Sequence, residues 1–231
     1  MHPSIKIKIL LLCITIFSFI SCKKENSEII EYLKHNNYSY IRGGTDSDEY
    51  NFIVLGKEKE LGDSIIIFFD KNYTIKNYLL FNCPNSYQPV VVSEKYIVLG
   101  FMRNISSGLK DFIIYNKKRN EISFAEASYP FIWNLFIDND NLFYSSEMAN
   151  PHLNVVKLQT GEQYHYDTFY CPYAEFGIEN GTVYATNDGI DFYVYQEGQF
   201  EKATVKLNSF NTKNYELKDF NINGDFLEKL H

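Results

Sequence analysis

Three proline-containing segments of similar sequence recur along this chain at nearly equal spacing. They occupy residues 81–84, 127–130 and 169–172, so that their prolines are 46 and 42 residues apart. Each segment is followed by four short apolar runs, separated by polar turn residues such as those at 179–181 and 196–198. Runs of this length that are rich in aromatic and β-branched residues predict β-strands. The chain therefore contains a repeated unit of four strands.

An earlier segment fits the same pattern, which gives four units in all. A propeller blade is a four-stranded antiparallel sheet of about 40 to 50 residues, and propellers typically have about four to eight blades. We therefore predict an all-β, β-propeller-like fold of about four four-stranded blades in a small or incomplete ring. The predicted strands cover residues 38–42, 51–56, 64–69 and 74–81, then 90–92, 96–101, 111–115 and 121–125, then 135–137, 142–145, 154–158 and 163–167, and finally 176–178, 182–186, 191–195 and 200–205.

The repeats define the limits of the main domain. We expect the β-propeller-like repeat domain to cover residues 38–207, because an apolar sheet of this kind buries its faces only by stacking on its neighbours. A C-terminal closing segment follows at 208–231, in which we expect a strand over 215–222 and a helix over 226–230 to contribute to a partial fifth blade. The alternative architecture is a β-sandwich whose strands are evenly spaced.

The N-terminus has the form of an export signal. Lys6 and Lys8 introduce a nearly uninterrupted apolar run over residues 9–20. That length suits the core of a signal peptide, since a membrane-spanning helix needs about 20 apolar residues to cross about 30 Å of hydrocarbon. We therefore predict a signal peptide over residues 1–21, with an uncleaved hydrophobic anchor as the alternative.

The sequence Phe-Ile-Ser-Cys at residues 19–22 resembles the lipobox of bacterial lipoproteins. The resemblance implies that Cys22 is acylated and becomes the first residue of the mature chain, with 22–37 as a lipid-anchored tether that contains a short helix at 27–35. Lys23 in place of Asp implies the outer membrane as the destination. The Cys-Lys-Lys-Glu start and the repeats are similar to those of Bacteroidetes lipoproteins, some of which are displayed at the cell surface. We expect attachment to the periplasmic or surface face of that membrane through the acyl chains.

Charge and composition restrict the classes of partner. The chain has 22 basic and 29 acidic residues, and removal of Lys6 and Lys8 with the signal changes the net charge from -7 to -9. An acidic domain lacks the basic surface expected of a nucleic-acid binder, so we expect no nucleic acid. It would also be repelled by anionic headgroups, which predicts a solvated domain held by its lipid. Aromatic residues make up 17% of the chain, which excludes disorder.

The sequence gives little indication of metal or cofactor binding. Cys83 and Cys171 remain after acylation of Cys22, and either a disulfide between them or two buried thiols fits an exported domain. The Asp-Asn-Asp-Asn run at 138–141 fits a calcium loop or a hairpin turn, and the hairpin explains it more simply because the other units also have turns there. Zinc-ligand spacings and phosphate-binding glycine loops are absent from the sequence, so we expect no metal and no cofactor.

Candidate ligand-binding residues follow from the geometry of a propeller. The loops that join the second strand to the third, and one blade to the next, lie on the same face around the central channel. Aromatic rings with a few polar groups on such a face are suited to flat ligands and sugars. The candidates on this face are Tyr87, Arg103, Trp133, Glu147, His152, Tyr173 and Asp188.

These features favour a lipid-anchored, non-catalytic binding module for a protein or a glycan. One alternative is a carbohydrate-active enzyme that uses carboxylates such as Glu147 and Asp188, because the separation of paired carboxylates depends on the fold. Another alternative is an immunity-type lipoprotein that neutralises a toxin, because an acidic domain suits a basic partner. The sequence assigns no catalytic residue.

Overall fold

Seventeen strands and two short helices make up the part of the chain that the computed structural model describes. The described residues are 26–36, 38–46, 50–57, 62–83, 89–101, 111–127, 132–146, 153–166, 174–186, 189, 191–204, 217–218, 220 and 226–231. The predicted all-β class is confirmed. The strands are β1 (Tyr38–Asp46), β2 (Tyr50–Lys57), β3 (Gly62–Asp70), β4 (Ile75–Cys83), β5 (Val90–Val92), β6 (Tyr96–Gly100), β7 (Phe112–Asn116), β8 (Glu121–Ala125), β9 (Ile132–Asp138), β10 (Asn141–Ser146), β11 (Leu153–Lys157), β12 (Gln163–Tyr166), β13 (Glu175–Glu179), β14 (Thr182–Thr186), β15 (Phe192–Gln196), β16 (Gln199–Lys202) and β17 (Leu217–Lys218).

Sixteen of these strands form four antiparallel sheets of four consecutive strands each. Sheet 1 contains β1 to β4, sheet 2 contains β5 to β8, sheet 3 contains β9 to β12 and sheet 4 contains β13 to β16. Each sheet corresponds to one predicted unit, so the propeller-like arrangement of four blades is confirmed. The two layers of a β-sandwich are not formed.

Three apolar clusters hold successive sheets together face to face. One cluster joins sheets 1 and 2 through residues such as Phe68 and Ile113, and the next joins sheets 2 and 3 through residues such as Phe112 and Tyr144. The third cluster joins sheets 3 and 4 around Phe143. Strands of an inner sheet are buried on both faces, which explains why β6 is apolar along its whole length.

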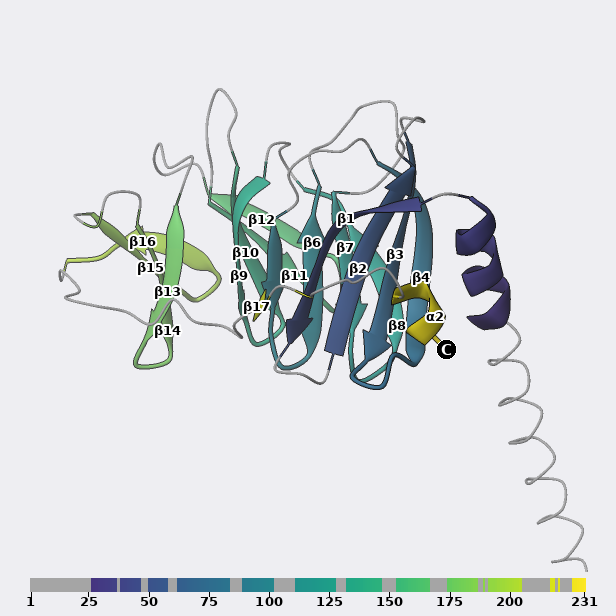
Figure 1. Ribbon diagram of the computed structural model, residues 1–231. Coiled ribbons are helices and arrows are strands. Elements are labelled where there is room, and N and C mark those ends of the chain that lie inside the picture. Colours follow the sequence, from purple (N-terminus) through teal and green to yellow (C-terminus); the bar gives the residue numbers. More distant parts are fainter. Residues whose placement is uncertain are drawn as a thin grey trace, which may run out of the picture.

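The sheets form an open row rather than a closed ring (Figure 1). Within the described residues, no apolar cluster joins sheet 4 to sheet 1. The outer face of sheet 1 is covered by the N-terminal helix at residues 26–35 and by α2 (Phe226–Lys229), which pack on Ile53, Ile65 and Ile67. The two helices therefore cap one end of the row. No helix in the described part of the chain is long and apolar enough to cross a membrane.

The C-terminal segment returns to the first sheet. The strand β17 pairs antiparallel with β1, so sheet 1 has five strands in the order β17-β1-β2-β3-β4. The predicted partial fifth blade is therefore wrong, because the open edge of β1 offers backbone partners that an isolated strand would lack. The predicted C-terminal helix is confirmed as α2, and His231 bonds through its amide to Tyr73 O at 3.0 Å and through its carbonyl to the Ile75 amide at 2.7 Å.

The strand order gives every sheet two different ends. In each sheet the chain passes from the first strand to the second, and from the third to the fourth, at one end, which we call the hairpin end. The chain passes from the second strand to the third, and from each sheet to the next, at the opposite end, which we call the loop end. Several hairpin turns use residues with positive φ, including Asn180 (52°), Gly181 (77°), Glu197 (50°) and Gly198 (86°). These are the turn positions that the sequence indicated.

Candidate functional site

The predicted binding face corresponds to the loop end of the sheets. Trp133 is the candidate residue that falls within the described part of the chain, where it lies half-buried in β9 next to Asn134. Asn134 Nδ2 donates a hydrogen bond to Ala174 O at 2.9 Å, which ties sheet 3 to the start of sheet 4. The other candidates and the lipidation site lie outside the described residues: Tyr87, Arg103, Glu147, His152, Tyr173, Asp188 and Cys22.

Buried polar side chains support the loop end of sheet 3. Ser145, Ser146 and Asn154 are fully buried at the ends of β10 and β11. Asn154 Nδ2 donates to Ser146 Oγ at 3.2 Å and to Tyr144 O at 3.5 Å. Sequence reasoning missed these residues, whose signal is a polar pair at the end of an otherwise apolar strand. They hold the adjacent strand ends in place.

A group of three tyrosines, one exposed and two half-buried, lies between β12 of sheet 3 and β15 of sheet 4. We define the tyrosine patch as Tyr164, Tyr166 and Tyr195 together with Lys157 and Glu162. Tyr164 is 39% exposed on the edge strand β12, and its hydroxyl donates to Glu162 Oε2 at 3.4 Å. Lys157 Nζ lies 5.2 Å from the Tyr164 ring centroid and 3.3 Å from Glu162 Oε2. The patch combines an exposed ring with both signs of charge.

The inner part of the tyrosine patch is fixed by the core between sheets 3 and 4. The rings of Tyr166 and Tyr195 contact Phe200, at centroid distances of 5.6 Å and 5.2 Å. Burial, together with the neighbouring Tyr195, raises the pKa of Tyr166 to about 12, and burial also raises the pKa of Tyr195. Tyr164 and Glu162 raise the pKa of Lys157. The patch therefore combines the exposed Tyr164 ring with a Lys157 ammonium that holds its proton more firmly and is paired with Glu162.

The sequence analysis assigned Tyr164 and Tyr166 to an ordinary strand over 163–167, and Tyr195 to one over 191–195. Alternating Tyr164 and Tyr166 on that strand is the signal that was available. The strand order places β12 at the edge of sheet 3, so within the described residues no further strand pairs with its outer side. Tyr166 is half-buried because its ring packs on Phe200 of sheet 4, whereas Tyr164 on the same strand packs beside Lys157 and stays exposed.

The negative charge of the molecule is concentrated in sheets 3 and 4, which also carry the tyrosine patch. Residues 132–204, which span sheets 3 and 4, contain 11 acidic and 2 basic residues. The remainder of the chain from residue 22 onward contains 18 acidic and 18 basic residues. The net charge of -9 expected for the mature chain therefore resides in sheets 3 and 4 and their connections, where the tyrosine patch also lies.

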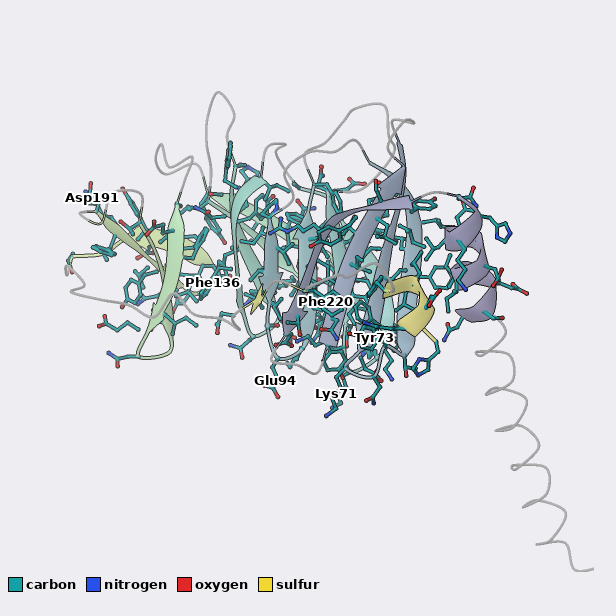
Figure 2. All side chains as sticks on the ribbon, in the orientation of Figure 1. Lys71, Tyr73, Glu94, Phe136, Asp191 and Phe220 are labelled. Atoms are coloured by element: carbon teal, nitrogen blue, oxygen red, sulfur yellow. The ribbon has the colours of Figure 1, made fainter. Side chains whose placement is uncertain are left out.

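A small open pocket lies at the hairpin end of sheet 1. Its volume is about 250 Å³, and it is lined by Tyr50, Asp70, Lys71, Asn72 and Lys76. Burial by itself would raise the pKa of Asp70, but hydrogen bonds from Lys76 and from the amides of Thr74 and Asn72 hold that pKa below its ordinary value. Figure 2 shows Lys71 and Tyr73 of the same turn at this end of the molecule. The Asp70 carboxylate therefore stabilises the turn between β3 and β4 by accepting these hydrogen bonds.

The Asp-Asn-Asp-Asn run at 138–141 forms the hairpin between β9 and β10. One Asp140 oxygen accepts hydrogen bonds from Lys95 Nζ at 3.3 Å and Tyr96 Oη at 3.0 Å, and the other accepts one from Gln159 Nε2 at 2.7 Å. Burial and the bonded Asp140 carboxylate raise the pKa of Tyr96 to about 12. The side chain that a calcium ion would need is thus occupied by donors from sheets 2 and 3, which supports the hairpin interpretation.

A buried ion pair joins sheets 1 and 2 at their hairpin ends. Lys117 Nζ is paired with Asp46 and also donates to Ser93 O at 2.6 Å. The two charged side chains are 3% and 4% exposed, and the ammonium lies 5.3 Å from the Tyr50 ring centroid. Sequence reasoning missed this pair, because its partners are 71 residues apart and Lys117 begins a basic run that is typical of a solvated turn. Its role is to fix two sheets relative to each other.

Comparison with known proteins finds no matching family model and no matching curated protein. Similar solved structures include the computationally designed Ika4 protein, with a TM-score of 0.44 and 12% identity over 69% of this chain and 91% of that one. The N-terminal domain of Nup159 has a TM-score of 0.41 and 10% identity over 72% of this chain and 49% of that one. HIRA(644-1017) has a TM-score of 0.44 and 8% identity over 71% and 54%. With likenesses this low, the assignment of the fold rests on the four sheets themselves.

Proposed function

We propose that this chain is a lipid-anchored lipoprotein of the cell envelope that acts as a non-catalytic binding module for a protein or a glycan. The tyrosine patch carries this proposal. Tyrosine rings with a hydrogen-bonding edge supply contact area at low entropic cost, and they are enriched where proteins bind other molecules.

The tether is the second part of the proposal. The lipobox-like Phe-Ile-Ser-Cys at 19–22 supports acylation of Cys22, and Lys23 supports the outer membrane as the destination. Each buried acyl methylene contributes about 0.8 kcal/mol, so two or more chains hold a domain firmly. A Cys22→Ala variant is expected to leave the membrane fraction for the soluble fraction, together with loss of metabolic labelling by palmitate. Palmitate labelling and membrane retention that both persist in Cys22→Ala would contradict acylation at this residue.

A basic protein is the partner that the charge distribution favours. Residues 132–204 carry 11 acidic residues and 2 basic ones, and complementary charge accelerates association with a cationic surface. This distribution supports the second candidate, an immunity-type lipoprotein whose toxin is basic. That candidate predicts that association slows steeply as the salt concentration rises.

Site-specific photo-crosslinking in intact cells tests the patch. A benzophenone amino acid at position 164 is expected to give a discrete cross-linked product, and the same group at position 124 none. Tyr164 and Phe124 are matched because both are 39% exposed on edge strands of different sheets. Once a ligand is isolated, Tyr164→Ala should weaken its binding at least about tenfold and Phe124→Ala should not. Equal cross-linking at both positions would refute a role for the patch.

A further inference from the structure

The described chain begins at the hairpin end of sheet 1. Asn26 Nδ2 donates a hydrogen bond to Ile75 O, at the start of β4, at 3.4 Å. Ile29 and Leu33 are 5% and 1% exposed, and they fix the N-terminal helix to the outer face of that sheet. Three residues separate Cys22 from Asn26, and the four steps between them span at most about 3.6 Å each, so the two Cα atoms lie within about 14 Å. A lipid on Cys22 would keep sheet 1 near the bilayer.

Exposed apolar side chains are concentrated at the same helix-capped end of the row. Five large hydrophobic residues are exposed among the described ones, and three of them, Tyr32, Tyr40 and Leu80, belong to the N-terminal helix or to the edges of sheet 1. Tyr40, Leu55, Ile65 and Leu80 form one row across the sheet. The inner two are 5% and 0% exposed, whereas the ends of the row are 47% and 50% exposed.

Tyr32 extends the exposed end of this row at β1. Its ring centroid lies 5.9 Å from that of Tyr38, and the two hydroxyls are 3.3 Å apart. Tyr38 and Tyr40 are two residues apart on β1 and therefore lie on the same face of that strand. Tyrosine prefers the boundary between lipid and water, because its ring is apolar and its hydroxyl remains hydrated.

The distribution of charge favours the same orientation. Sheet 1, sheet 2 and the two terminal segments belong to the part of the mature chain that has 18 acidic and 18 basic residues. Sheets 3 and 4, at the other end of the row, belong to the part with a net charge of -9. A negative membrane surface repels that half and has little net effect on the first.

We propose that the helix-capped end of the row rests on the bilayer surface, through Tyr32 of the N-terminal helix and through Tyr40 and Leu80 at the two sides of sheet 1, while sheets 3 and 4 project away from it. This inference rests on the proposed lipid anchor at Cys22 and goes beyond it, because a tether alone would leave the domain free to turn. The orientation directs the tyrosine patch and the acidic half toward the aqueous compartment. The helix-capped end of the row therefore binds a phospholipid surface.

Tryptophan fluorescence tests the orientation with a pair of matched positions. Trp133 is the single tryptophan, so Trp133→Phe gives a dark background into which Tyr40→Trp or Tyr164→Trp is introduced. The two tyrosines are 47% and 39% exposed, in sheets 1 and 3. The acylated proteins are reconstituted in vesicles of phosphatidylethanolamine and phosphatidylglycerol, with or without brominated acyl chains. Brominated lipid is expected to quench the Tyr40→Trp variant at least about twice as strongly as the Tyr164→Trp variant, because quenching requires contact near the interface.

Three other outcomes decide against the inference in different ways. Equal quenching of both variants, or stronger quenching of Tyr164→Trp, in vesicles that carry the protein refutes the orientation and leaves the anchor intact. Protein that does not float with the vesicles refutes the anchor itself. Flotation with neither variant quenched, together with a dimer in cross-linking through position 40, shows that a second copy of the chain covers the face instead.

Discussion

At the level of single residues, the least expected feature is the buried ion pair between sheets 1 and 2. Lys117 and Asp46 are 3% and 4% exposed, so either charge left alone would lack both water and a partner. We therefore predict that Lys117→Met lowers the free energy of unfolding by about 3 to 5 kcal/mol, as expected when one member of a buried pair is removed. Urea denaturation followed by circular dichroism measures this.

The adjacent lysine provides the control for this prediction. Lys118 is exposed in the same turn, and Lys118→Met should change stability by no more than about 0.5 kcal/mol. In the double variant Asp46→Leu/Lys117→Met, both charges are replaced by apolar groups, so part of the lost stability should return. Equal midpoints for the two single lysine variants would show that the pair contributes no more than a surface charge.

Tyr96 makes the stability depend on alkaline pH. Its pKa is raised to about 12 by burial and by the bonded Asp140, whereas an unfolded tyrosine titrates near 10. The folded chain therefore holds this proton more tightly, and the associated stability, complete below pH 10, is lost as pH rises toward 12. In Tyr96→Phe this fall should be shallower between pH 10 and 12. An unchanged slope in thermal melts across that range would contradict the assignment.

Sequence reasoning identified turn residues well and long-range polar pairs poorly. Asn180 and Glu197 were placed in hairpin turns, because a residue of that kind followed by Gly between two apolar runs is a local signal. The partners of Lys117 and Asp140 lie in other sheets, so no local pattern contains them. Most predicted loop-end site residues lie outside the described chain, while the tyrosine patch was hidden in an ordinary strand.

At the level of whole elements, sheet 1 has no neighbouring sheet on its outer face, and the N-terminal helix covers that face instead. Leu33 is 1% exposed in the cluster that also contains Ile65 and Phe226. We expect Leu33→Ala to cost about 2 to 5 kcal/mol, through lost burial and the cavity that it leaves. Chemical denaturation measures the change, with Lys34→Ala on the exposed side of the same helix as the control. A cost below about 1 kcal/mol would mean that the helix is not a fixed part of the fold.

The strands were largely predictable because each apolar run lies between turn residues. The predicted strands at 90–92, 121–125 and 182–186 coincide with β5, β8 and β14, and most others differ from the structure by one to three residues at an end. The role of the C-terminal strand was not predictable in this way. Whether β17 begins a fifth sheet or joins an existing one depends on which edge is open near it, and that edge belongs to β1, at the other end of the sequence.

At the level of the whole molecule, an open row of sheets differs from a ring in how local unfolding of one sheet affects the others. Each apolar cluster joins one sheet to the next, and within the described residues none joins sheet 4 back to sheet 1. Stability in such an array is close to a sum of individual sheets and their nearest-neighbour contacts. The sequence repeat indicated the number of sheets, but it did not indicate whether they close, because closure depends on the curvature between neighbours.

This difference makes hydrogen exchange a test of the architecture. Phe176 is 4% exposed between sheets 3 and 4, and Phe176→Ala should cost about 3 to 5 kcal/mol locally. Amides of β13 to β15 should then exchange faster by a factor of about a hundred or more, while those of β3 should keep their protection, because sheet 1 opens independently. The reciprocal variant Ile67→Ala in sheet 1 should accelerate β3 and spare β14. Equal loss of protection in all four sheets after either substitution would show that the row unfolds as one unit, as a closed ring would.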